Sequence, residues 1–209
     1  MNRRVAITGM GLCTPQGRTV AEFWRNLLAG RSSIGPITLF DASALRARIG
    51  GEVKPFDPSE LLEAFPEAEQ EKDRKVWLGL DAAGRALADS GLSLATFREA
   101  TLFVGVSLET FLIQEVTLAA PADDLSSALI GFALNQQRSN QLQTPLDRLT
   151  QLLGDRYDFR RGRHTNCSAC AAGAQVIGEA FRRLRAGSAE VALAGATDST
   201  LNPLALGGF

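Results

Sequence analysis

The sequence predicts an α/β fold in which strands and helices alternate along one chain. The segment 190–196 is a continuous apolar run, which is typical of a strand in a parallel sheet that is covered on both faces. Segments with the apolar spacing of helices precede it, and Gly30, Gly91 and Gly187 are placed to end them. Parallel strands joined by right-handed crossover helices are therefore expected.

The first predicted elements lie before residue 60. Val5–Gly11 is predicted to form a buried strand that ends in glycines. Thr19 can cap a helix over Val20–Ala29, because its hydroxyl can accept a hydrogen bond from a free N–H group of the first turn. A loop rich in Gly, Pro and Ser then runs to about Pro58, with a short strand near 49–53.

The later elements continue the alternation, without an internal repeat or a long linker, so residues 1–209 are treated as one domain. They are a helix over Lys72–Ser90, a strand over Thr101–Leu108, helices over Leu125–Asn135 and Pro145–Leu153, an extended segment over Arg163–Ala169, a helix over Ala171–Leu184 and a strand over Glu190–Ala196.

Composition and charge exclude several classes of protein. With 209 residues, 45% of them hydrophobic, the chain can bury a core. Its 22 Lys and Arg residues against 23 Asp and Glu residues give no basic field for nucleic acid. The apolar run Val5–Met10 is too short for a signal peptide or a membrane span, and three Cys are too few for a disulfide scaffold. We expect a cytoplasmic protein with neither nucleic acid nor membrane as partner.

Cys170 is the strongest candidate for a reactive residue. It lies between an extended segment and the helix 171–184, so free N–H groups and the helix dipole favour its thiolate. Gly173 and Gly178 inside that helix cost about 1 kcal/mol each relative to Ala, a cost that tight packing between two layers would offset. Charges occur only in the last turns, so we expect the first half to be buried on all sides. An inert buried thiol is the alternative.

Three other patterns suggest chemistry, and each has a simpler interpretation. Cys167 and Cys170 form a Cys-x-x-Cys, but no second pair or histidine set completes a zinc or redox site, so no metal is expected. Gly9-Met10-Gly11 lacks the third glycine of a dinucleotide fingerprint, because residue 14 is Thr, and no cofactor is expected. His164 lies on an extended segment with a rise of about 3.3 Å per residue, too far from Cys170 for a hydrogen bond. His164 is interpreted as structural or solvent-facing.

Residues 166–180, around Cys170, closely resemble the nucleophile segment of β-ketoacyl-(acyl-carrier-protein) synthases, the condensing enzymes of fatty-acid and polyketide assembly. The resemblance covers most of the chain, in several motifs that follow the family's order. The motifs are Val5–Gly17, Asp73-Arg74, residues 83–92, residues 166–180, Gly187–Ala196 and Gly207–Phe209.

The resemblance implies the thiolase-like fold, in which two similar halves form a layered αβαβα arrangement, and this chain looks like the N-terminal half. It also implies that Cys170 is the catalytic nucleophile and that the Cys170 N–H forms part of the oxyanion hole. Ser107, Gly208 and Phe209 fall in segments similar to those at the family's acyl pocket, and we expect them to bind substrate. The family position that matches Cys167 is usually not Cys, so Cys167 is interpreted as a packing residue.

The resemblance implies partners as well. In the family, two catalytic His residues and a second oxyanion-hole N–H come from the C-terminal half, and none of these groups is found in the sequence. Condensation by this chain alone is not expected, because the enolate oxyanion would lack its stabilising groups. We expect an acyl carrier protein and a C-terminal half or partner ketosynthase chain, in a homodimer or heterodimer. The segments 105–110 and 119–163 depart from the family pattern, which leaves substrate and partner choice open.

Two hypotheses about function follow. In the first, the chain is the N-terminal half of a β-ketoacyl synthase and carries an acyl group as a thioester on Cys170. In the second, it is a non-catalytic relative that binds a carrier protein or a partner synthase and shapes chain length. We also expect Cys170 to be alkylated before Cys13 and Cys167, and the isolated chain to expose an apolar patch around the helix 171–185 and to associate.

Overall fold

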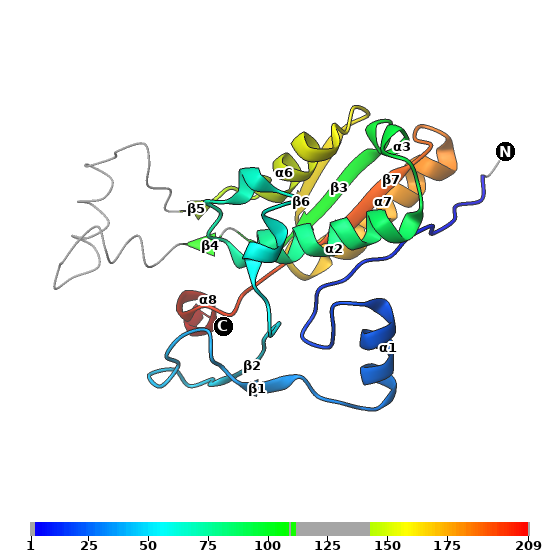
Figure 1. Cartoon of the computed structure of the whole chain (residues 1–209). Helices are drawn as coiled ribbons and strands as arrows, with labels where there is room; N and C mark the ends of the chain where they lie inside the picture. Colours follow the sequence, from blue (N-terminus) through cyan, green and yellow to red (C-terminus); the bar gives the residue numbers. More distant parts are fainter. Residues whose placement is uncertain (1–2, 109, 112–142, 209) are drawn as a thin grey trace, which may run out of the picture.

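A computed structural model of the chain describes residues 3–108, 110–111 and 143–208 (Figure 1). Its centre is a three-stranded parallel sheet in the order β6–β3–β7. The strands are β3 (Thr101–Val106), β6 (Arg163–Cys167) and β7 (Ala192–Ala196). The predicted α/β fold with parallel strands is confirmed.

Helices cover both faces of this sheet (Figure 1). On one face α7 (Ala172–Ala186) contacts all three strands, and on the other lie α2 (Arg74–Ser90) and α6 (Arg148–Tyr157). β3 is buried along its whole length, because its side chains point alternately into two cores. Leu102, Val104 and Val106 pack with α2 and α6, whereas Phe103 packs with Val176 and Ala180 of α7.

Local signals in the sequence account for the helix ends. The Thr19 hydroxyl accepts a hydrogen bond from the Glu22 N–H at 3.1 Å and caps α1 (Val20–Leu28). Gly91 and Gly187 directly follow α2 and α7 with φ of 63° and 76°, a left-handed conformation that glycine adopts without steric cost. Gly30 lies two residues beyond the end of α1, with φ of 64°. All three predicted glycine ends are confirmed. Two shorter helices are α3 (Leu94–Arg98) and α8 (Pro203–Gly208).

Two small antiparallel pairs lie outside the central sheet. β1 (Ile34–Pro36) pairs with β2 (Ile49–Gly51), and β4 (Thr110–Phe111) pairs with β5 (Gln143–Thr144). The short strand expected near 49–53 is therefore present as β2, and its partner β1 lies in a segment that was expected to be a loop.

Residues 5–11 differ from the prediction, because they form no strand. Ile7 is 82% exposed, and the segment lies along α2. A Cβ atom on Gly11 would lie 2.0 Å from the Ala82 carbonyl oxygen. The glycines that were interpreted as a tight turn instead allow the backbone of this segment to lie directly against the helix.

The two helices predicted between residues 119 and 163 have different outcomes. The one over 125–135 lies outside the described residues. The one over 145–153 is present as α6, which begins three residues later and continues to Tyr157. The Arg148 N–H donates to the Pro145 carbonyl at 3.0 Å, so a turn precedes the helix at the proline.

α7 differs from the expectation in its exposure. Its buried residues, Ala172, Val176 and Ala180, all face the sheet. Ile177 is 57% exposed and Phe181 is 45% exposed, so the helix is covered on one face and open on the other. The first half is not buried on all sides because the described residues supply only one sheet for it to pack on.

A buried ion pair lies at the start of α2. The side chains of Asp73 and Lys75 are each 1% exposed, and Lys75 Nζ lies 2.5 Å from Asp73 Oδ2. The Asp73 carboxylate also accepts a hydrogen bond from the Lys75 N–H at 3.0 Å and caps the helix. The Lys75 carbonyl in turn accepts a hydrogen bond from Thr197 Oγ1 at 2.6 Å, which ties the start of α2 to the chain that leaves β7.

No helix among the described residues is both long enough and apolar enough to span a bilayer.

Candidate active site

The candidate site lies at the edge of the sheet where the parallel strands end. β3 ends at Val106, β6 at Cys167 and β7 at Ala196, and the carboxyl ends of parallel strands share one edge. In open α/β sheets this edge is where ligands bind. Ser107, Cys170 and Asp198 follow the three strands closely and therefore lie along this edge.

Cys170 occupies a 3₁₀ turn, Ala169–Ala171, and α7 begins directly after it at Ala172. Its side chain is exposed. The predicted position, between an extended segment and a helix, is confirmed, and the 3₁₀ turn is an additional feature. The Ala172 N–H, at the start of α7, donates to the Ala169 carbonyl, so this N–H group is used within the turn.

The backbone is bent sharply next to Cys170. Ala169 has φ of 49°, a left-handed conformation that costs a non-glycine residue roughly 1–2 kcal/mol. The Ala171 N–H donates to the Ser168 carbonyl at 3.1 Å and closes the turn. Backbone held in this region is found at active sites, where the surrounding structure maintains it.

Polar side chains brace this turn against the first turns of α7. Gln175 Oε1 accepts hydrogen bonds from Ser168 Oγ at 2.8 Å and from Asn166 Nδ2 at 3.0 Å. Ser168 Oγ also lies 2.5 Å from Asn166 Oδ1. The three side chains therefore hold the end of β6, the turn and α7 in a fixed relation around Cys170.

Ser107 connects the ends of all three strands. Its hydroxyl donates to Asp198 Oδ2, beyond the end of β7. Its carbonyl accepts a hydrogen bond from the Cys167 thiol at 3.1 Å, at the end of β6. Burial raises the pKa of Asp198, although the Ser199 N–H and the charge of Lys75 act in the opposite direction. Ser107 thus contacts a carboxyl group through its hydroxyl and a thiol through its carbonyl, at the edge that carries Cys170.

Cys167 is exposed, so its interpretation as a packing residue is wrong. It is the last residue of β6, paired with Val106 at the carboxyl end of the sheet. The described part of the chain does not cover this end, so the thiol stays open to solvent.

The three residues expected to bind substrate have different outcomes. Ser107 lies at the same edge as Cys170. Gly208 is the last residue of α8 and borders open space, since a Cβ atom there would meet no other atom within 4 Å. Phe209 lies outside the described residues. Contact of these residues with substrate stays a prediction.

His164 packs against β3, in agreement with its structural interpretation. Its ring stacks on Phe103 with the centroids 4.9 Å apart and the planes 12° from parallel. Burial lowers the pKa of His164, and the nearby Arg183 guanidinium lowers it further. Both effects favour the neutral ring.

Asp198 and Gln175 were missed in the sequence. Asp198 could have been found from its position, two residues beyond a predicted parallel strand and hence at the edge where ligands bind. Gln175 gave no such signal, because its contacts with Ser168 and Asn166 depend on the geometry of the turn between them.

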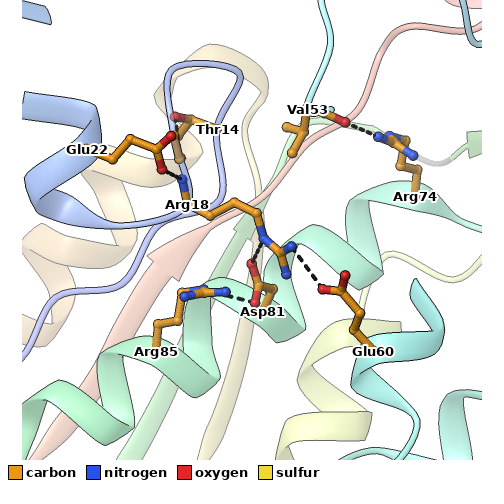
Figure 2. Close-up of polar contacts among 9 residues, drawn as sticks. Thr14, Arg18, Glu22, Val53, Glu60, Arg74, Asp81 and Arg85 are labelled. Atoms are coloured by element: carbon orange, nitrogen blue, oxygen red, sulfur yellow. Dashed lines mark hydrogen bonds and ion pairs between the residues drawn. The ribbon is translucent and has the colours of Figure 1, made fainter. Parts of the chain in front are cut away.

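Cys13 lies outside this edge, beside a charged cluster in which Asp81 holds two arginines (Figure 2). Arg18 Nε and Arg85 Nε lie 3.1 and 2.9 Å from the Asp81 carboxylate. Burial raises the pKa of Cys13 to about 12, and the Asp81 carboxylate raises it as well, while the two guanidinium groups only partly oppose them. Cys13 is therefore held as a neutral thiol.

We expect iodoacetamide to label Cys13 about a thousandfold more slowly than Cys167 and Cys170 near neutral pH. The reason is that a rise of its pKa from 9.0 to about 12 reduces its thiolate by about that factor. Peptide mapping by mass spectrometry after timed labelling measures the three rates, and labelling in denaturant, where the thiols should react alike, is the control. Equal rates for Cys13 and Cys170 in the folded chain would contradict this electrostatic account of Cys13.

Comparison with known proteins shows which family the chain belongs to. The family model described as "Beta-ketoacyl synthase, N-terminal domain" matches residues 2–209. A 3-oxoacyl-[acyl-carrier-protein] synthase 2 of Synechocystis sp. is 31% identical over 99% of this chain and 48% of its own length. A putative polyketide beta-ketoacyl synthase 1 of Streptomyces cyaneus is 32% identical over 100% of this chain and 49% of its own length. The chain spans about half the length of the curated relatives that it matches.

Solved structures agree on the fold. The ishigamide ketosynthase/chain length factor matches with a TM-score of 0.76 at 24% identity, over 100% of this chain and 50% of the other. A beta-ketoacyl synthase from Burkholderia phymatum matches with a TM-score of 0.71 at 23% identity, over 99% of this chain and 49% of the other. The described architecture is that of the N-terminal half of a thiolase-like ketosynthase fold.

Proposed function

The chain belongs to the family of β-ketoacyl synthase N-terminal domains, and from this we propose that it is the acyl-accepting half of a condensing enzyme of fatty-acid or polyketide synthesis. In this proposal Cys170 accepts an acyl group from an acyl carrier protein. A second half, which carries the catalytic histidines, completes the condensation site.

The observation that carries the proposal is the position of Cys170. It is exposed, it follows a strained turn, and it lies at the carboxyl edge of a parallel sheet next to the start of a 15-residue helix. A thiolate at such a helix start is stabilised by the dipole, and the family resemblance assigns the Cys170 N–H to the oxyanion hole of a tetrahedral intermediate.

The proposed step is a thioester exchange. The Cys170 thiolate attacks the carbonyl carbon of the acyl thioester, and the carbonyl oxygen carries the negative charge in the tetrahedral intermediate. When the intermediate collapses, the bond to the carrier sulfur breaks, the carrier thiolate leaves, and the acyl group stays on Cys170. Neither an oxidant nor a cofactor is needed for this exchange.

Condensation needs groups beyond these residues. The single histidine of the sequence, His164, is stacked on Phe103, so it does not serve Cys170 as a base. The open face of α7, with Ile177 and Phe181 exposed, supports a second layer of protein on that side of the helix. We propose that the half with the histidines packs on this face, as a separate chain or as part of the same protein.

The likeness to a ketosynthase/chain length factor supports an alternative, a non-catalytic subunit that binds a carrier protein or a partner ketosynthase. Such a subunit would share the fold and the open face of α7 but would carry no acyl group. The two functions differ in one measurable property, which is the covalent adduct on Cys170.

Incubation of the chain with an acyl-carrier-protein thioester, followed by intact and peptide mass spectrometry, tests the proposal. We expect the mass of one acyl group on the peptide that contains Cys170, and no adduct in Cys170→Ala. Cys167→Ala is the matched control, because it removes the exposed thiol at the end of β6, three residues before Cys170, and should keep the adduct.

The other outcomes are equally informative. Binding of the carrier protein without an adduct would favour the non-catalytic alternative. An adduct that persists in Cys170→Ala, or its loss in Cys167→Ala alone, would show that Cys170 is not the acyl acceptor.

A further inference from the structure

A cavity of about 250 Å³, lined by both polar and apolar residues, lies beside the candidate active site. Its walls come from five segments: the loop after residue 12, the loop after β1, β2 and the residues that follow it, the first turns of α2, and the segment after β7. This volume is smaller than the roughly 300–1,000 Å³ typical of pockets for larger organic ligands, so it suits a ligand of few atoms. Its polar lining includes Thr14, Glu52, Arg74, Asp198, Ser199 and Thr200.

Arg74 is the notable residue of this cavity. Its guanidinium is half-buried, donates one hydrogen bond to the Val53 carbonyl at 2.5 Å, and lies 5.2 Å from the ring centroid of Phe56 (Figure 2). Among the described residues, no carboxylate lies within ion-pair distance of it. Burial lowers the pKa of Arg74, and the charge of Glu52 only partly opposes this effect.

Two neighbouring arginines, Arg18 and Arg85, do form ion pairs with carboxylates. Arg18 lies 3.0 Å from Glu60 and 3.1 Å from Asp81, and Arg85 lies 2.9 Å from Asp81 (Figure 2). A guanidinium presents five N–H donors in a fork that matches a carboxylate or a phosphate. Arg74 uses one of them in the hydrogen bonds of the described residues, and it lines the cavity.

Neither carboxylate in the cavity wall neutralises Arg74. Glu52 Oε1 accepts hydrogen bonds from the N–H groups of Thr38 and Leu39 at 2.6 and 3.0 Å, and its Oε2 lies 2.8 Å from Lys54 Nζ. Burial would raise the pKa of Glu52, but these donors outweigh it and lower the pKa to about 2, so Glu52 is an anion with its own partners.

The second wall carboxylate, Asp198, is also engaged. Its Oδ1 accepts a hydrogen bond from the Ser199 N–H at 2.7 Å, and its Oδ2 accepts one from the Ser107 hydroxyl. Burial raises the pKa of Asp198. Arg74 is therefore the positive charge of this cavity wall, and among the described residues it has no direct ion pair, since Glu52 acts on it only from farther away.

We propose that this cavity binds a small anion, a carboxylate or a phosphate group, with the Arg74 guanidinium as its counter-charge and the hydroxyl groups of the wall as further donors. The proposal does not depend on acylation of Cys170, because Arg74 and the segments that hold it lie outside the turn that contains Cys170. The cavity shares the wall residue Asp198 with the carboxyl edge of the sheet, so the bound anion lies next to the candidate active site.

Isothermal titration of the 209-residue chain with malonate and, separately, with inorganic phosphate tests the proposal. We expect Arg74→Gln to weaken binding of the anion by about ten- to a hundredfold, the range for loss of a charge-assisted hydrogen bond. Arg74→Lys keeps the charge but loses the fork, and it should retain part of the affinity. Arg25→Gln is the matched control, because it removes one exposed positive charge from α1 and should leave the affinity unchanged.

A second measurement uses the unsubstituted chain, so it tests the proposal even if the variants do not fold. Phenylglyoxal modifies arginines, and peptide mapping should show that the anion slows modification of Arg74 but not of Arg25. Protection by malonate alone assigns the site to carboxylates, and protection by phosphate alone assigns it to phosphates. If neither anion protects Arg74, or if Arg25→Gln weakens binding as much as Arg74→Gln, the proposal is wrong.

Discussion

Lys75→Met is expected to lower the free energy of unfolding by about 3–5 kcal/mol, the range for removing one partner of a buried ion pair. Asp73 and Lys75 are each 1% exposed and in direct contact, so the substitution leaves the Asp73 carboxylate buried without its cation. Denaturant titration of the two chains measures the difference.

The double variant Asp73→Asn/Lys75→Met separates the ion pair from other effects of residue 75. It removes both charges, and Asn can still cap α2, so we expect it to regain most of the stability lost in Lys75→Met. If the double variant is as unstable as the single one, the loss comes from packing at residue 75 and not from an uncompensated charge.

Gly105→Ala is expected to destabilise the fold by about 1–3 kcal/mol and to slow acylation of Cys170. A Cβ atom at this position would lie 2.8 Å from the Ala172 carbonyl carbon and 2.9 Å from its oxygen. These are backbone atoms in the first turn of α7, so the helix must move away from β3. Because Cys170 lies two residues before Ala172, its position relative to the edge of the sheet changes with the helix.

Gly84→Ala is the matched control for Gly105→Ala. Gly84 lies within α2, and a Cβ atom there would meet no other atom within 4 Å. Because Ala has the higher helix propensity, this substitution should stabilise the chain by up to about 1 kcal/mol. The two variants should therefore shift the denaturation midpoint in opposite directions. A Gly105→Ala chain as stable and as reactive as the original would show that the close approach of β3 and α7 does not position Cys170.

Features fixed by a few neighbouring residues could be predicted from the sequence. Thr19 caps α1, Gly91 and Gly187 end their helices, and the turn that contains Cys170 lies between a strand and a helix as expected. Each of these depends on hydrogen bonds or φ angles within one turn, where residue type decides the outcome.

Features that depend on contacts between segments far apart in the sequence could not be predicted. Residues 5–11 have the pattern of a strand, yet Gly9 and Gly11 fit against α2. The small residues of α7 suggested burial on all sides, but in the described chain only one face has a neighbour. At the candidate site, the links from Ser107 to Cys167 and to Asp198 join three separate strands, which no local pattern reveals.

The register of the central sheet also affects how the protein folds. Leu102 pairs with Arg163 on one side and with Leu193 on the other, so β3 has no strand partner in this sheet until much of the chain has been made. Pairings between residues far apart in the sequence require large loops to close, which slows folding relative to local contacts. During synthesis from the N-terminus, Leu102 therefore leaves the ribosome long before Leu193 does. β6 and the turn with Cys170 can join β3 first, and the carboxyl edge of the sheet is complete only when β7 arrives. Until then β3 is an apolar strand with at least one unpaired edge, the kind of strand that favours aggregation.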